Sequence, residues 1–218
     1  MVTSNELAES FKYVAQAIHN RRDYLCELDS HAGDGDHGIS MDLGWQAISN
    51  VESDGVPCAQ YLRNCGKDFI TAVGASIGPL YGTAFLRAAK ACDGKDQLSV
   101  QDVIEMFHAA VAGMGERGGA KLGDKTLLDT LLPVDSALAD GVKQNLSLNT
   151  LLEKVVSEAE RGMESTAELV SRIGRSSRLG ERSRGQLDPG AASAYVVIEA
   201  LVTYLLPLAE NVGSIQSI

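Results

Sequence analysis

The spacing of apolar residues along the chain is typical of amphipathic helices. Near the start, Leu7, Phe11, Val14 and Ile18 recur every three or four positions, which places them on one face of a helix. Similar spacing continues along the chain, and no stretch shows convincingly the alternation that a half-buried strand requires. Eight helices are therefore predicted, over residues 7–25, 39–48, 58–73, 80–91, 99–112, 125–138, 148–173 and 190–208.

Capping and helix-breaking residues mark the predicted ends of these helices. The pairs Thr3–Glu6 and Ser99–Asp102 have the spacing of capping boxes, and Asp188–Pro189 places a capping side chain and a first-turn proline before the last helix. Pro79 suits the first position of its helix, because its missing N–H has no partner there. Residues 113–124 are expected to form a glycine-rich loop. Short loops between such helices predict an all-α, antiparallel bundle.

Composition agrees with a helical bundle and narrows the range of partners. The chain has 218 residues, 44% of them apolar and only 5% aromatic, so a single domain over residues 1–218 with an aliphatic, alanine-rich core is expected. A net charge of −10 argues against a nucleic-acid partner. The four cysteines lack a C-x-x-C pair, and neither a signal pattern nor an apolar run of membrane-spanning length is present. No membrane partner is expected, and the cytoplasm is the expected compartment.

An acidic, glycine-rich segment after the first predicted helix is the strongest chemical signal. Asp29, Asp34 and Asp36 lie within eight positions and are interleaved with glycines, which allow the backbone to fold carboxylates onto a common point. Mg²⁺ prefers such oxygen ligands together with substrate phosphates. An EF-hand is excluded, because its glycine and glutamate positions hold Ile39 and Trp45. The alternative is an acidic loop that only caps the next helix.

Three further segments are candidates for binding phosphate. Residues 74–79 place glycines directly before a helix, where backbone N–H groups can bind an anion, although such a turn is also common without a ligand. Residues 118–126 miss the P-loop spacing by one position and follow a helix, so a P-loop is rejected. Residues 174–185 concentrate arginines, which suit phosphate, and the alternative there is a solvated loop.

Four ordered motifs resemble the ADP-binding L subunit of bacterial dihydroxyacetone kinases and the matching C-terminal domain of the ATP-dependent kinases. The family's G-D-G-D-H-G loop, G-G-x-S-G-P-L-Y-G turn, G-D-K-T-M segment and G-x-R-S-x-G-x-x-D-P-G tail correspond to Gly33–Gly38, Gly74–Gly82, Gly123–Leu127 and Gly180–Gly190. The resemblance covers nearly the whole chain.

This resemblance implies an eight-helix closed barrel with a nucleotide, ADP or ATP, at one end. By family likeness, Asp29, Asp34 and Asp36 hold two Mg²⁺ ions that bridge the nucleotide phosphates. No residue is identified as catalytic. The implied nucleotide-binding residues are His37, Gly38, Ile39, Ser40, Ser76, Ile77, Gly118, Leu127, Arg175, Asp188, Pro189 and Gly190.

The resemblance also implies a reaction and partners. The family transfers a phosphoryl group from the Mg-bound nucleotide to a small hydroxyketone held on a separate K subunit, so this chain alone is expected to be inactive on sugar. Two phosphoryl routes stay open: retained ADP rephosphorylated by a phosphotransferase-system protein, or exchangeable ATP. A homodimer also stays open.

Three positions depart from the family pattern. Ile77 stands where the family has a serine beside the phosphates, Ala75 replaces a glycine, and Leu127 replaces a methionine. Backbone N–H contacts can survive the change at position 77, whereas a side-chain phosphate contact cannot. Three alternatives follow: a nucleotide-bound interaction module without catalysis, a paralogue acting on another small sugar, and a helical structural protein.

Overall fold

Local capping fixes where several helices of the computed structural model begin. Thr3 and Glu6 form a complete capping box at the first helix, and Ser99 and Asp102 form another. The structure describes residues 1–209, which contain eight α-helices and two 3₁₀ segments. They are α1 (Ser4–Ser30), α2 (His37–Ser49), α3 (Cys58–Ala72), α4 (Ile77–Ala91), α5 (Val100–Gly118), α6 (Leu128–Lys143), α7 (Leu148–Ser165), η1 (Thr166–Glu168), η2 (Arg175–Ser183) and α8 (Pro189–Ala209).

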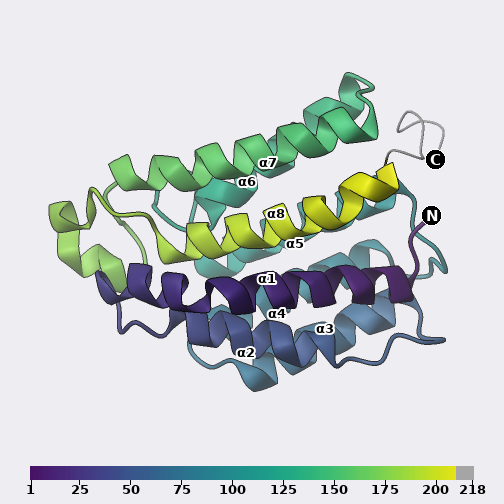
Figure 1. Cartoon of the computed structure of the whole chain (residues 1–218), viewed down its shortest axis with the longest axis horizontal. Helices are drawn as coiled ribbons and strands as arrows, with labels where there is room; N and C mark the ends of the chain where they lie inside the picture. Colours follow the sequence, from purple (N-terminus) through teal and green to yellow (C-terminus); the bar gives the residue numbers. More distant parts are fainter. Residues whose placement is uncertain (210–218) are drawn as a thin grey trace.

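The eight helices form a closed, up-and-down ring. Each helix packs against the next one in the sequence, and α8 returns to pack against α1 (Figure 1). Because the direction alternates, α1, α3, α5 and α7 end where α2, α4, α6 and α8 begin, at the left end of Figure 1. The prediction of an all-α antiparallel bundle is confirmed. In residues 1–209 the only β-type pairing is an isolated bridge between Val2 and Leu98.

Aromatic side chains fill one side of the ring. Phe11 and Phe85 each form a T-shaped pair with Trp45, and Phe69 stacks on Tyr81 with ring centroids 4.9 Å apart. Aliphatic residues and alanines form most of the remaining core, as the composition indicates. An apolar cavity of about 270 Å³ remains between these aromatic residues and the apolar faces of α5 and α8.

Two predicted helix ends were wrong. Residues 113–118 continue α5, because α5 packs along α4 and this packing outweighs the weak helix propensity of glycine. At the other end of the connection, α6 starts at Leu128 and not at residue 125, since the backbone at Lys125 has a left-handed φ of 62°.

Two later boundaries also differ from the predictions. Helix α7 ends at Ser165, and the predicted continuation to residue 173 is short 3₁₀ and irregular structure. Pro79 is the third residue of α4 and not the first. This position is still allowed for proline, because none of the first three N–H groups of a helix has an intrahelical acceptor.

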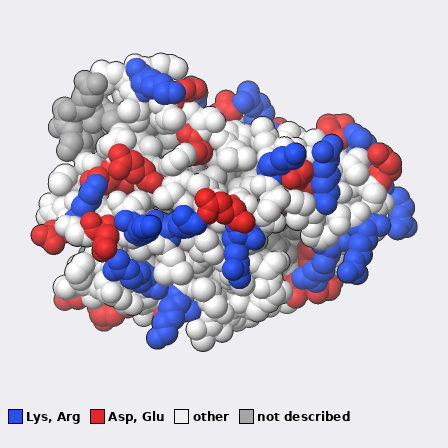
Figure 2. Space-filling model, turned by 180° about the vertical axis from the view of Figure 1, so that it is seen from behind, with Lys and Arg blue, Asp and Glu red and all other residues white. Residues whose placement is uncertain are grey.

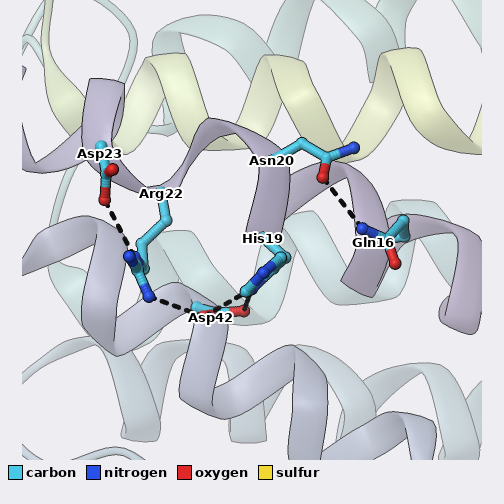
Figure 3. Close-up of polar contacts among 6 residues, drawn as sticks. All are labelled: Gln16, His19, Asn20, Arg22, Asp23 and Asp42. Atoms are coloured by element: carbon cyan, nitrogen blue, oxygen red, sulfur yellow. Dashed lines mark hydrogen bonds and ion pairs between the residues drawn. The ribbon is translucent and has the colours of Figure 1, made fainter.

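The α1–α2 pair positions the acidic loop between them. On its outer surface, His19 Nδ1 lies 3.1 Å from Asp42, whose carboxylate is 4.0 Å from Arg22 (Figure 3). Such exposed contacts contribute little to stability. The tighter constraint is Gly38, where an added Cβ would overlap the carbonyl oxygen of Arg22. The two helices therefore approach closely at the start of α2.

Helix α8 is long and apolar enough to cross a membrane by length and composition alone, and the core helix of a bundle meets the same criteria. In this fold α8 is part of the ring and packs against α1, α6 and α7. Its apolar character is accounted for by this packing.

Candidate functional site

Loops and helix ends at one end of the ring line a cavity of about 460 Å³ with both polar and apolar walls. The cavity lies where α1 and α5 end and where α2, α4, α6 and α8 begin. Seen from behind, basic side chains gather at this end of the molecule, on the right of Figure 2. The chain around η2 supplies five arginines there, Arg172, Arg175, Arg178, Arg182 and Arg184.

The acidic loop brings its three carboxylates together. Oxygen atoms of Asp29, Asp34 and Asp36 lie within 4.8 Å of one another. Asp29 belongs to the last turn of α1, and its Oδ2 accepts the backbone N–H groups of Asp36 at 3.1 Å and His37 at 3.3 Å. Gly33 leaves room for this arrangement, because an added Cβ there would overlap Oδ1 of Asp29. The loop is thus folded around the Asp29 carboxylate.

Arg175 faces this carboxylate cluster from η2. Its guanidinium pairs with Asp34 and lies 3.9 Å from Asp36. The hydrogen bond from Arg175 lowers the pKa of Asp34, whereas desolvation and the neighbouring Asp34 raise the pKa of Asp36. A cation at this point offsets the repulsion between the carboxylates.

Two helix N-termini line the cavity, and one of them, the start of α4, has no side-chain cap. Ser76 precedes the first turn of α4, and its hydroxyl makes no capping hydrogen bond. At the start of α8, Pro189 has no N–H, and the N–H of Ala191 donates to the carboxylate of Asp188 at 2.8 Å. The first N–H groups of a helix lack intrahelical acceptors and carry a partial positive charge, so the uncapped start of α4 suits an anion.

Buried Asp188 and half-buried His37 are titratable groups on the cavity wall. Asp188 accepts the N–H of Ala191 at 2.8 Å, and burial raises its pKa to about 7. Desolvation lowers the pKa of His37 to about 4, so the imidazole is neutral at pH 7. Its Nε2 lies 2.9 Å from the hydroxyl of Ser193 in α8.

The connection between α5 and α6 is held by two aspartates. Asp129 is 1% exposed and accepts the N–H groups of Gly123 at 2.6 Å and Thr126 at 2.7 Å. Asp124 accepts the N–H of Lys121 at 2.9 Å. This turn joins two helices, which agrees with rejecting a P-loop.

Most of the sequence-predicted site residues meet at this cavity. Its walls include these eleven of them: Asp29, Asp36, His37, Ser76, Ile77, Gly118, Leu127, Arg175, Asp188, Pro189 and Gly190. Asp34 lies beside the cavity in the carboxylate cluster. Gly38, Ile39 and Ser40 occupy the first turn of α2 and do not line the cavity. Their contact with a nucleotide stays a prediction.

Sequence reasoning missed about half of the cavity wall. The additional lining residues are Ala32, Pro79, Leu80, Met114, Arg117, Ala120, Lys125, Thr126, Leu128, Ile173, Gly174 and Ser176. Several are apolar and carry no chemical signal in a sequence. Lys125 and Thr126 were visible as part of the G-D-K-T segment, but their use became apparent only with the fold.

The residues present suit a hard divalent cation. The cluster offers three carboxylates and no thiolate, which is the donor set of Mg²⁺ and not that of zinc. The cluster also adjoins a cavity lined by the uncapped N-terminus of α4, so an anion can bind next to the cation.

Comparison with known proteins agrees with this geometry. The chain is 38% identical over 185 residues to the ADP-binding subunit DhaL of the PEP-dependent dihydroxyacetone kinase of Escherichia coli (strain K12), covering 82% of this chain and 86% of that protein. It is 31% identical over 204 residues to the ADP-binding subunit DhaL of the PTS-dependent dihydroxyacetone kinase of Lactococcus lactis, covering 93% and 98%.

A solved structure shares the fold, and a protein-family model matches most of the chain. The dihydroxyacetone kinase from C. freundii, crystallised with AMP-PNP and Mg²⁺, superposes with a TM-score of 0.70 at 24% identity, over 90% of this chain and 33% of that one. The family model of the DAK2 domain matches residues 31–203. The chain therefore belongs to the DAK2 domain family.

Proposed function

We propose that this chain is the nucleotide-binding subunit of a dihydroxyacetone-type kinase. It passes a phosphoryl group from a Mg-bound nucleotide to a small hydroxyketone held on a separate K subunit. The observation that carries the proposal is the convergence, at one cavity, of three carboxylates with the uncapped N-terminus of α4. That combination suits a cation and a phosphate side by side.

The proposed roles follow from the donor chemistry. Asp29, Asp34 and Asp36 would hold two Mg²⁺ ions, and these would supply positive charge beside the phosphoryl group that is transferred. Backbone N–H groups at Ile77 and Gly78 bind phosphate oxygens, while Leu127 and the first turns of α2 and α8 border the rest of the nucleotide.

The phosphoryl donor and the compartment are proposals from the relatives' names. Two relatives are named as subunits of PEP-dependent and PTS-dependent kinases, which supports retained ADP rephosphorylated by a phosphotransferase-system protein. We place the chain in the cytoplasm, where such phosphoryl donors act, and treat residues 1–218 as one nucleotide-binding domain, of which residues 210–218 lie outside the described part. Alone it has no activity on sugar.

The test begins with the purified protein. Denaturation followed by chromatography measures released nucleotide, and elemental analysis measures magnesium in the same sample. Near-equimolar ADP with magnesium supports the proposal. The second step supplies a K subunit and dihydroxyacetone, with either ATP or phosphoenolpyruvate and the relay proteins. Absence of turnover in both assays contradicts the kinase function.

Ile77 favours a second candidate, a nucleotide-bound interaction module without phosphoryl transfer. This side chain lines the cavity where the family pattern has a hydroxyl, and it packs against the apolar core. A phosphate contact from that side chain is impossible. Turnover by the wild-type chain with a K subunit rules out this candidate. Retained nucleotide without turnover, unchanged by Ile77→Ser, favours it.

A further inference from the structure

Lys125 is a buried lysine whose ammonium group is held by backbone carbonyls. Only 3% of the residue is exposed. Its Nζ donates to the carbonyl oxygens of Gln186 at 2.5 Å, Thr166 at 2.6 Å and Leu169 at 3.3 Å. An ammonium has three donors and is costly to bury without partners, so the three carbonyls satisfy it completely. Thr166 also caps the C-terminus of α7, where a cation is favoured.

The three carbonyls come from segments that lead into the candidate site. Residues 166–169 precede η2, which begins at Arg175, and Gln186 lies three residues before the first residue of α8. Lys125 itself lies three residues before the first residue of α6. One side chain therefore joins three parts of the cavity wall that are distant in sequence.

Neighbouring hydrogen bonds link the same segments. The N–H of Asp188 donates to the Thr166 hydroxyl at 3.0 Å, and the N–H of Arg172 donates to the carbonyl of Asp124 at 3.1 Å. The charge of Lys125 also favours the ionised form of buried Asp188, whose pKa burial raises. The ammonium is the charged centre of this network.

We infer that Lys125 is a positioning residue for nucleotide binding. Its ammonium sets the relative places of Leu127, Arg175 and the start of α8, and it acts through these groups without a bond of its own to the nucleotide. The inference rests on the proposed function, since it concerns the same cavity. A residue that serves only folding would lower the stability of the chain and leave the affinity of the folded protein unchanged.

The test compares two lysines of one loop. Lys125→Met keeps the length of the side chain and removes the charge, while Lys121→Met makes the same change at an exposed position. Isothermal titration of nucleotide-free protein with Mg-ADP, at a temperature where circular dichroism shows each variant folded, measures the dissociation constant. We expect Lys125→Met to raise it by at least about tenfold, or about 1.4 kcal/mol. Lys121→Met is expected to match the wild type.

Conservative substitutions keep the inference testable where Lys125→Met does not fold. Lys125→Arg retains a cation with several donors, and Lys125→Gln retains donors without charge. We expect arginine to preserve more Mg-ADP affinity than glutamine. Folded variants at position 125 that all bind Mg-ADP like the wild type, even with lower melting temperatures, overturn the positioning role. Failure of the wild type and of Lys121→Met to bind Mg-ADP instead overturns the nucleotide site itself.

Discussion

At the scale of single residues, the missing side chain of Gly33 is as important to the metal site as the carboxylates. An added Cβ at Gly33 overlaps Oδ1 of Asp29, the carboxylate around which the acidic loop folds. We expect Gly33→Ala to weaken Mg²⁺ binding in the presence of ADP by about 10–100-fold, because a displaced ligand no longer faces its partners. Calorimetric titration with Mg²⁺ measures this loss.

Gly115→Ala is the matched control for this prediction. A Cβ at Gly115 meets its nearest neighbour at 3.6 Å, an ordinary van der Waals contact. Its Mg²⁺ affinity is expected to equal that of the wild type. Equal Mg²⁺ affinity in Gly33→Ala and Gly115→Ala would contradict the proposed role of Asp29.

Asp188 makes the stability of the chain depend on pH. Burial raises its pKa to about 7 in the folded protein, whereas an aspartate in an unfolded chain has a pKa of about 3.9. The folded state therefore holds a proton that the unfolded state has released. The contribution of this group to stability is fully present below about pH 4 and is lost as the pH rises through about 7.

Replacing Asp188 with asparagine removes this dependence. Urea unfolding with EDTA, from about pH 4 to about pH 8, is expected to show wild-type stability falling relative to Asp188→Asn by on the order of 3 kcal/mol. The exposed Asp96→Asn serves as control and should follow the wild-type curve. Parallel curves for Asp188→Asn and wild type would show that Asp188 is already ionised at low pH.

At the scale of an element, the turn between α3 and α4 contains a strained alanine. Ala75 has a φ of 54°, in the left-handed region that favours glycine. We expect Ala75→Gly to stabilise the chain by about 0.5–1 kcal/mol in thermal or urea unfolding. Ala139→Gly, at an exposed position inside α6, is expected to cost about 1 kcal/mol. The same substitution is thus expected to raise the free energy of unfolding at position 75 and to lower it at position 139. A lower free energy of unfolding in both variants would contradict backbone strain at Ala75.

The elements also show which features were predictable from the sequence. The capping boxes at Thr3 and Ser99 use residues three positions apart, so their helix starts could be predicted. The end of α5 at Gly118 depends on packing against α4, which local propensity does not encode. Lys125 was missed as a site residue because its acceptors lie 41, 44 and 61 positions away.

At the scale of the whole molecule, closure of the ring joins the two halves of the site. The acidic loop follows α1, and the start of α8, in a segment about 150 residues later, lines the same cavity. Packing of α8 on α1 brings these parts together, and His37 bonds to Ser193 across the same junction at 2.9 Å. The site therefore exists only in the closed ring, and its motifs could be recognised in the sequence but not assembled without the fold.

Because the site exists only in the folded ring, its ligand should stabilise the entire chain. A ligand at 100 times its dissociation constant adds about 2.7 kcal/mol to the free energy of unfolding. For a chain of 218 residues this corresponds to a rise in melting temperature of roughly 5–10 °C. We expect this rise with Mg-ADP in differential scanning calorimetry of nucleotide-free protein.

ADP with EDTA should give a smaller rise in melting temperature, because the carboxylates then lack the cation that joins them to the phosphates. Asp34→Asn combined with Asp36→Asn should abolish the difference between the two conditions. An unchanged melting temperature of the wild type with Mg-ADP would instead indicate that the acidic loop only caps α2.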